Sequence, residues 1–365
     1  MPNKRSQCYS TVHAHQVLMS EYKLLPPSIF IVDKPKGLSS FDIIRQFKKS
    51  IPLTKDKIGH LGTLDPFATG MLLIACSGAA RLSDYTHQFF SKSYHALGLL
   101  GVTTPSGDPT TAISSYENFS FPSHPHVISL LNEKLQNHFL GEYMQSPHSF
   151  SAAKFQGRAL YKWAREGKLL TKEEKRREIL NLEVKSIFKA SLADYFPEVA
   201  EADASMAPTI YAIEFTATVS SGTYIRSLFA DIAKSLNTIG TLVELKRTAI
   251  GHLSLEGSSH KIVTPLRPSP STVENRLSPS ELLPLPSIDL CGVSLKQYTN
   301  GMPIPLENLQ VETSLFSQYQ SYYQVDPDGL TWIYDTNTAP TLIGLGVLQK
   351  NLLTPLINWS ARLKR

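Results

Sequence analysis

Apolar and polar positions along the chain change between strand-like and helix-like spacing without a regular order. Apolar runs at residues 29–32 and 71–76 predict two short buried strands. Between them, Ser39 and Asp42 resemble a capping box, and Phe41 begins a set of apolar residues at helical spacing, so we expect a helix to start here. Strands and helices mixed in this way, without strict alternation, favour an α+β fold over a doubly wound sheet.

The middle of the chain predicts two more strands, three helices and one surface insertion. The strands are expected at 94–102 and 211–219, the helices at 158–168, 172–180 and 225–236, and the insertion at 190–208. The helix at 172–180 carries mostly charged residues and should lie in water, whereas the helix at 225–236 is amphipathic.

Proline and serine gather in one segment, residues 261–285, which is therefore the best candidate for a linker between domains. Short strand-like segments beyond it, at 331–334 and 341–348, predict a small β-rich domain at the C-terminus. The expected organisation is an N-terminal tail at 1–27, a main domain at 28–260, the linker at 261–285 and the small domain at 286–365.

Composition fits a folded protein of two domains. The chain has 365 residues, of which 42% are hydrophobic and 18% charged, so a buried core is expected and wholesale disorder is excluded. A net charge of +5 is too small to prove nucleic-acid binding, but it is compatible with one basic face. The three cysteines have no CxxC spacing, no apolar run approaches the roughly 20 residues of a membrane span, and no apolar stretch follows the N-terminus. We therefore expect a cytoplasmic protein without disulfides, zinc or a signal peptide.

Residues 59–70 form the segment that is most unusual in composition. It contains three glycines and Pro66, so a loop is expected, and Asp65 stands directly before the proline, which biases it toward an extended backbone. A carboxylate on a loop that leads into a buried strand suits catalysis. Because Asp before Pro is also common in ordinary turns, loop chemistry alone favours the structural interpretation.

The same segment, Gly-His-Leu-Gly-Thr-Leu-Asp-Pro-Phe-Ala-Thr-Gly, resembles the signature of the bacterial TruB family of tRNA pseudouridine synthases. Further blocks of the family occur in the same order along the chain, at 33–41, 77–82, 151–167, 222–226 and 245–247. The resemblance implies a pseudouridine synthase catalytic domain at 28–260, with a mixed, largely antiparallel sheet flanked by helices. Over 286–350 the chain resembles the family's small PUA-like RNA-binding domain only weakly.

The resemblance implies an enzyme that isomerises uridine 55 in the T-loop of tRNA to pseudouridine. The target base is flipped out of the RNA, its glycosidic bond is broken, and the base is rejoined to the sugar through carbon. We expect tRNA as the partner, with no organic cofactor, no metal, no membrane, no guide RNA and no obligate protein partner. The chain shows no Walker loop, dinucleotide fingerprint or zinc pattern.

By resemblance, Asp65 is the catalytic carboxylate, acting as nucleophile or base at the junction of sugar and base. Arg226 matches the arginine that pairs with it, and an opposite charge at that position is expected to keep Asp65 ionised despite burial. The alternatives are a strand cap for Asp65 and an ordinary surface arginine for Arg226.

Four other positions match residues of the family that contact the flipped nucleotide. Tyr94 would stack on the base, although a buried strand tyrosine is the simpler interpretation. Tyr224 would approach the base edge, Leu245 would form an apolar wall, and His60 would fill the space that the flipped nucleotide leaves.

Basic residues in the middle block are candidates for contacts with the RNA backbone: Lys154, Arg158, Lys162 and Arg165. The last three have helical spacing and predict a stripe on one helix face. A merely solvated surface is an equal alternative.

Two motifs differ from the family pattern. The chain has Gln145-Ser146-Pro147-His148 where the family has Gln-x-Pro-Pro, and Thr104-Pro105-Ser106-Gly107-Asp108 where it has Thr-Asp-Thr-x-Asp. We therefore expect tRNA docking to differ in detail. Two other functions remain open: an RNA chaperone whose modification activity is incidental, and a guide-RNA-dependent synthase of the archaeal and eukaryotic type.

Overall fold

The structure is a computed structural model of the chain. It describes residues 26–50, 57–122, 124–146, 148, 150, 154–164, 166–168, 173–196, 199, 210–256, 262–263, 275–307 and 309–360. Almost all of the predicted N-terminal tail therefore lies outside the described residues.

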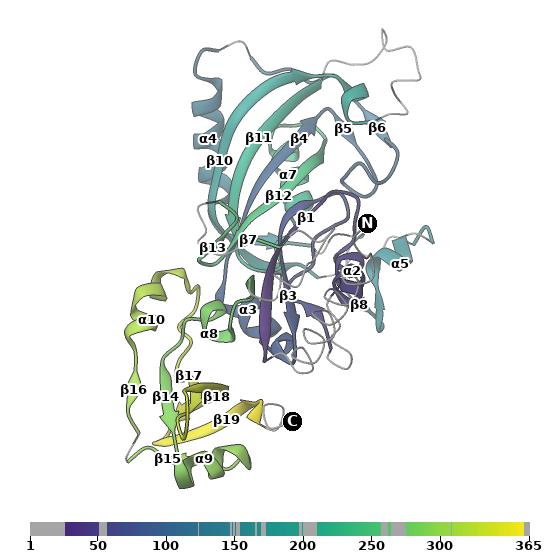
Figure 1. The fold of residues 1–365 in the computed structure, drawn as a ribbon. Helices are drawn as coiled ribbons and strands as arrows, with labels where there is room; N and C mark the ends of the chain where they lie inside the picture. The colour runs from purple at the N-terminus through teal and green to yellow at the C-terminus, as the bar shows by residue number, and fades with distance from the viewer. Residues whose placement is uncertain are drawn as a thin grey trace, which may run out of the picture.

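A large twisted sheet forms the upper part of the molecule (Figure 1). Its strands run in the order β1 (Ser28–Lys34), β3 (Thr69–Cys76), β12 (Gly240–Ile250), β4 (Lys92–Leu100), β11 (Ile210–Val219), β10 (Lys175–Ala190) and β7 (Gly141–Gln145). Two short strands extend it, β2 (Gly59–His60) beside β3 and β13 (Leu253–Ser254) beside β12. Only the pairing of β3 with β12 is parallel. The predicted mixed, largely antiparallel sheet is confirmed.

Helices flank this sheet (Figure 1). The longer ones are α2 (Ser40–Ser50), α3 (Ser83–Phe89), α4 (Val127–Phe139) and α7 (Ile225–Ser235), and the 3-10 helix η1 (Ala79–Leu82) leads into α3. Helix α4 packs against β10 and α7 against β12. Short peripheral elements are β5 (Val102–Thr103), β6 (Ser115–Tyr116), β8 (Lys154–Phe155), β9 (Arg158–Ala159), α5 (Leu160–Ala164) and η2 (Leu192–Asp194).

A second, smaller sheet forms the C-terminal part of the chain (Figure 1). Its order is β15 (Ile304–Pro305), β19 (Leu352–Asn358), β18 (Thr341–Gln349), β17 (Leu330–Asp335), β14 (Ser287–Leu290) and β16 (Val311–Glu312). It is accompanied by α8 (Pro279–Leu282), α9 (Gly292–Thr299), α10 (Ser314–Tyr319) and η5 (Gln320–Tyr322). The predicted strands at 331–334 and 341–348 are confirmed, and the β-rich sheet agrees with a PUA-like domain.

Strands β1 and β3 are buried on both faces. Alternate residues such as Phe30 and Leu72 belong to the core under the large sheet. The residues between them, such as Ile31 and Leu73, join a second core that also contains Trp332 of the small sheet. This second core includes four leucines of the predicted linker, Leu277, Leu282, Leu283 and Leu285. The domain boundaries themselves stay a prediction.

The predicted start of the first helix is confirmed. The backbone N–H of Ser39 donates to Asp42 Oδ2 at 2.9 Å, and the backbone N–H of Asp42 donates to Ser39 Oγ at 3.1 Å. These reciprocal bonds satisfy backbone groups that the first helical turn leaves unpaired. The buried face differs from expectation, since Phe41 is exposed whereas Ile43 and Phe47 are fully buried.

Three expectations from the middle of the chain are wrong. Within residues 172–180, Lys175 onward belongs to strand β10 rather than to a helix, because pairing with β7 and β11 overrides the helix propensity of its Lys, Arg and Glu residues. The helix predicted at 158–168 is only α5, five residues long. The expectation that the whole 190–208 insertion lies on the surface is wrong at its beginning, where Leu192 and Phe196 are buried against the large sheet although Ser191 and Asp194 are exposed.

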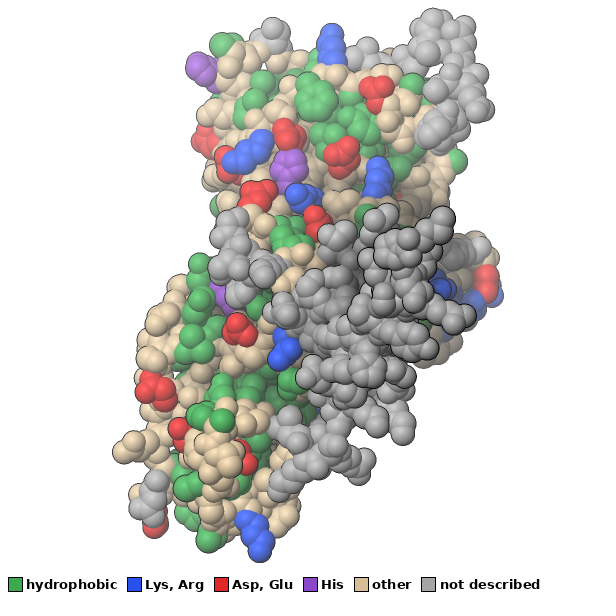
Figure 2. Space-filling view, in the orientation of Figure 1, with side chains coloured by type: hydrophobic (Ala, Val, Ile, Leu, Met, Phe, Trp, Pro, Cys, Tyr) green, Lys and Arg blue, Asp and Glu red, His purple; other side chains and the backbone are tan. Residues whose placement is uncertain are grey.

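None of the helices in the described ranges is long and apolar enough to cross a membrane. Over the described part of the face in Figure 2, basic and acidic side chains are interspersed rather than gathered by sign. On this face, the modest positive charge does not form a broad basic surface.

Candidate active site

The loop that contains Asp65 is held by backbone and hydroxyl bonds from the opening motif. Ser40 Oγ donates to the carbonyl of Leu64 at 3.0 Å and accepts from its N–H at 2.9 Å. The N–H of Gly37 donates to the carbonyl of Pro66 at 2.7 Å. The loop is therefore fixed to the start of α2 on one side, while its C-terminal end continues into the buried strand β3.

Two buried cations hold further carbonyls of the same loop. Arg247, on β12, donates to the carbonyls of Met71 at 2.8 Å, Gly62 at 3.1 Å and Thr63 at 3.3 Å. Lys34, at the end of β1, donates to the carbonyls of Leu38 at 2.7 Å, Pro35 at 2.9 Å and Pro66 at 3.4 Å. Neither residue was among the predicted site residues, although both stand in family blocks. The local sequence around Arg247 and Lys34 does not indicate that their side chains bind carbonyls of a loop that is distant in the sequence.

Arg226 joins two carboxylates. Its Nη2 lies 2.9 Å from Asp65 Oδ2, and its Nη1 lies 2.9 Å from Asp108 Oδ2. The same guanidinium donates to the carbonyls of Ser106 at 2.7 Å and Phe150 at 3.0 Å. These four acceptors fix the orientation of the planar guanidinium, and the Arg226 side chain is only 3% exposed. The Asp65 side chain is 32% exposed and is therefore accessible to a ligand.

The environment of Asp65 raises the pKa of its carboxyl above the usual value. Burial is the main cause, the charge of Asp108 adds to it, and Arg226 and Lys34 oppose it. Arg226 therefore favours the charged form of Asp65, as expected, but its effect does not outweigh burial and the charge of Asp108. That Asp65 is ionised stays a prediction.

Asp108 is a site residue that the sequence interpretation missed. The motif that contains it was expected only to make tRNA docking differ in detail. In the structure Asp108 is 3% exposed, and its Oδ1 accepts from Ser106 Oγ at 2.7 Å. His148 lies close by, with its ring facing Gly107, and burial together with the charge of Arg226 lowers its pKa to about 4. Both departures from the family pattern therefore meet around Arg226.

Tyr94 and Leu245 lie on neighbouring strands, β4 and β12. Each is 7% exposed, and both belong to the core cluster under the large sheet, together with Leu64 of the Asp65 loop. They are thus close to the loop that carries Asp65, but most of each side chain is packed. This packing suits a rigid wall beside a bound base and also suits the simpler core interpretation of Tyr94.

Tyr224 and His60 lie at the edge of the same region. Tyr224 precedes α7, and its backbone N–H and carbonyl are both bound by the side chain of Gln145, at 2.8 Å and 3.0 Å. His60 is half-buried on β2, and burial lowers the pKa of its imidazole. Gln145 therefore fixes the backbone of Tyr224, which lies two residues before Arg226. His60 lies two residues before Gly62, whose carbonyl accepts from Arg247.

The predicted stripe of basic residues is not brought to one helix face. Arg158 lies in β9, ahead of α5, where it pairs with Glu166 and stacks over Trp163 with 4.7 Å from Cζ to the ring centroid. Lys162 is exposed on α5. The side chain of Lys154 and all of Arg165 lie outside the described residues. Contacts of these four residues with RNA stay a prediction.

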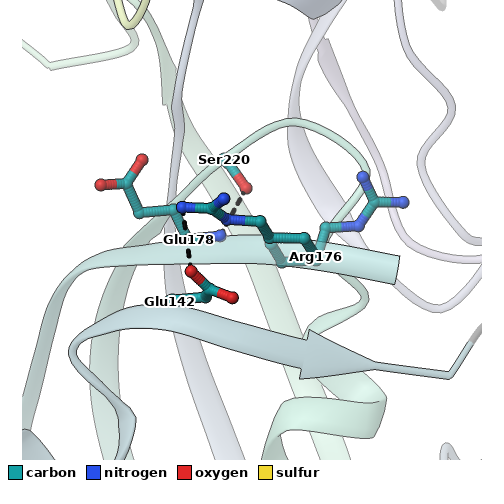
Figure 3. Close-up of a pocket in the computed structure, with 5 residues that line it drawn as sticks. Glu142, Arg176, Glu178 and Ser220 are labelled. Carbon is teal, nitrogen blue, oxygen red and sulfur yellow. Dashed lines mark hydrogen bonds and ion pairs between the residues drawn. The ribbon is translucent and has the colours of Figure 1, made fainter. Parts of the chain in front are cut away.

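A separate pocket of about 260 Å³ lies at the edge of the large sheet, lined by Glu142, Arg176, Arg177, Glu178 and Ser220. In Figure 3 the guanidinium of Arg176 turns toward Glu142, to which it is ion-paired at 2.9 Å. Asp65 does not line this pocket. Within the described ranges, no group of three or more His, Cys, Asp or Glu side chains is arranged to hold a metal ion.

Comparison with known proteins identifies close relatives in sequence. The model of the family described as TruB family pseudouridylate synthase (N terminal domain) matches residues 49–225. The tRNA pseudouridine synthase B of Thermotoga petrophila is 33% identical over 284 residues, covering 77% of this chain and 81% of the relative. That of Caldicellulosiruptor saccharolyticus is 30% identical over 309 residues, covering 84% and 93%.

Solved structures share the fold at lower identity. An H/ACA RNP bound to a substrate RNA containing 2′-deoxyuridine includes a chain with a TM-score of 0.59 and 18% identity, covering 94% of this chain and 88% of that one. A Cbf5-Nop10-Gar1 complex gives a TM-score of 0.58 at 19% identity, with 94% and 86% covered.

Proposed function

Since the chain belongs to the TruB family of pseudouridylate synthases, we propose that it isomerises uridine 55 in the T-loop of tRNA to pseudouridine, with Asp65 as the catalytic carboxylate. The observation that carries the assignment of Asp65 is its place on a braced loop, one third exposed, with Arg226 at 2.9 Å. The tRNA substrate is taken from the names of the relatives.

In this reaction, the bond between the sugar C1′ and the base N1 breaks, and a bond between C1′ and C5 forms. The C5 proton leaves and N1 gains a proton, so no atom or electron is lost overall. Asp65 acts at the sugar, either by attacking it or by removing a sugar proton, and both roles need the carboxylate form.

The other site residues support that chemistry. Arg226 orients the carboxylate and limits the rise in its pKa. Tyr94 stacks on the flipped base and recovers part of the cost of unstacking it, and Leu245 forms an apolar wall. Tyr224 contacts the base edge, and His60 occupies the space that the nucleotide leaves in the RNA.

The direct test uses purified protein and an unmodified tRNA transcript, with pseudouridine mapped by chemical labelling and primer extension. We expect a single new stop in the T-loop, without guide RNA or another protein. Binding without any stop would contradict the proposal and favour an RNA chaperone. A stop that requires an added guide RNA would favour the guide-dependent type of synthase.

Asp108 should position Arg226 for catalysis. Asp108→Asn keeps the shape of the side chain but removes one of the two charges that hold the guanidinium. We expect single-turnover rates to fall about 10- to 100-fold, the range for a catalytic group displaced by about 1 Å. Because the Asp108 charge raises the pKa of Asp65, its removal should also move the acidic limb of the pH–rate profile to lower pH.

The control is Asp194→Asn, at an exposed aspartate of η2 that is not among the hydrogen-bond or ion-pair partners of Arg226. It should leave the rate and the pH profile unchanged. A slower Asp108→Asn enzyme with an unshifted acidic limb would contradict the electrostatic part of this assignment.

A further inference from the structure

Among the residues that the structure describes, a buried lysine beside the candidate active site has no acidic partner. Nζ of Lys92, the first residue of β4, donates to Ser221 Oγ at 2.8 Å and lies 3.3 Å from His87 Nδ1. Ser221 Oγ and His87 Nδ1 are themselves 2.6 Å apart. Lys92 is 5% exposed, whereas His87 is exposed and Ser221 half-buried, so the cluster opens to solvent on that side.

Two arginines add to this positive charge. A side-chain carbon placed on Gly62 would lie 3.6 Å from Lys92 Nζ and 3.8 Å from Arg247 Nη1, so these two cations face the same point of the Asp65 loop. Arg177 donates to the carbonyl of Ser221 at 3.4 Å. Among the described residues, Lys92, Arg177 and Arg247 form no ion pair with a carboxylate. Buried cations that lack a negative charge nearby are costly even when they are hydrogen-bonded, and a ligand anion would offset the cost.

The cluster is adjacent to the residues assigned to the flipped base. Lys92 lies two residues before Tyr94 on β4, and Arg247 two residues after Leu245 on β12, so each pair shares one face of its strand. Arg247 and Tyr94 are also paired in register. An anion bound at Lys92 therefore lies beside the proposed base site.

We propose that Lys92, His87 and Ser221 bind a backbone phosphate next to the target uridine of the substrate RNA, with Arg177 and Arg247 adding to the positive potential. The proposal rests on the proposed function, since it places this phosphate relative to the flipped uridine. Bound there, the phosphate fixes the sugar of that nucleotide relative to Asp65. It also keeps the nucleotide extruded while the base is detached.

The charges around Lys92 favour the binding of an anion. Burial and the nearby charges of Arg247 and Arg177 lower the pKa of the Lys92 ammonium to about 7. Burial and Lys92 together lower the pKa of His87 to about 4. A phosphate at this point would stabilise the protonated form of Lys92.

The pocket in Figure 3 is a weaker candidate for the same ligand. It shares Arg177, but its other arginine is paired with Glu142, and Glu178 adds a second carboxylate to the lining. Its charges are thus largely balanced within the protein, in contrast to those around Lys92.

The test is a cycle of protein and RNA changes read by binding. T-arm stem-loop RNAs carry a neutral methylphosphonate at one linkage, either 5′ or 3′ of the target uridine. At one of these linkages we expect wild-type affinity to fall roughly tenfold, as for loss of a charged hydrogen bond. Lys92→Met should bind the all-phosphate RNA roughly tenfold more weakly than wild type does. Its affinity should not fall further when the RNA carries the methylphosphonate at that linkage.

Lys189→Gln, an exposed lysine on β10, is the matched control and should respond to the methylphosphonate as wild type does. Thermal unfolding checks that Lys92→Met is folded, and if it is not, the same cycle with Ser221→Ala decides. The proposal would be overturned if the losses of affinity from Lys92→Met and from the methylphosphonate were additive. It would also be overturned if neither methylphosphonate weakened binding to the wild-type protein. Turnover of the all-phosphate RNA by wild type is scored separately, so failure of the proposed function is distinguishable from failure of this inference.

Discussion

Asp65→Asn is expected to abolish pseudouridine formation while RNA binding is retained. The amide is nearly isosteric with the carboxylate, but it can neither attack the sugar nor accept a proton from it. The loss should be about 10³-fold or more, as for removal of a group that takes part directly in bond making. The measurement is single-turnover conversion of a T-arm RNA, with affinity determined on the same preparation.

Glu117→Gln provides a matched control. Glu117 is exposed, and its Oε1 accepts hydrogen bonds from Thr238 Oγ1 at 2.7 Å and from the backbone N–H of Ile239 at 3.2 Å, away from the Asp65 loop. It should turn over RNA as wild type does. An Asp65→Asn protein that keeps more than a tenth of the wild-type rate would remove Asp65 from its assigned role, since general acid–base or nucleophilic groups contribute roughly 10²-fold or more.

Gly70→Ala is expected to give the largest loss of stability. Gly70 has a φ of +100°, and an added Cβ would lie 2.3 Å from the carbonyl oxygen of Arg247 and 2.7 Å from its nitrogen. These backbone atoms belong to the parallel contact of β3 with β12 and cannot move freely. Backbone strain and overpacking together should cost about 3 kcal/mol or more of the free energy of unfolding. Urea denaturation measures it directly.

Gly37→Ala separates the two causes. Gly37 also has a positive φ, +89°, but an added Cβ there would meet nothing within 4 Å. It should cost only about 1 kcal/mol, from backbone strain alone. Equal losses in the two variants would show that steric contact with β12 contributes nothing at Gly70.

The sequence predicted the parts of the fold and site that are local in the chain. The apolar runs of β1 and β3, the capping box at Ser39 and the Asp65 loop each have short-range signals. Segment 172–180 was misread because its charged residues favour a helix in isolation, and only pairing with β7 and β11 makes it a strand.

Contacts between distant segments could not be predicted in this way. Arg226 and Asp108 are 118 residues apart, and nothing in the surrounding motifs indicates that they meet. Arg247 supports the Asp65 loop only because β12 lies parallel to β3. The family resemblance singled out Asp65 and Arg226, which the structure places 2.9 Å apart. The buried supporting contacts of Asp108 and Arg247 required the three-dimensional structure.

The burial of β1 and β3 on both faces limits how the chain can be shortened. Removing the small sheet would take Trp332 and Trp359 out of the core to which Ile29, Ile31, Met71 and Leu73 also belong. Strand β3 continues directly from the segment that carries Asp65, so a truncated protein would have exposed apolar surface next to that segment. The C-terminal sheet thus completes the core beneath β1 and β3, and variants that loosen it should aggregate before they lose affinity for RNA.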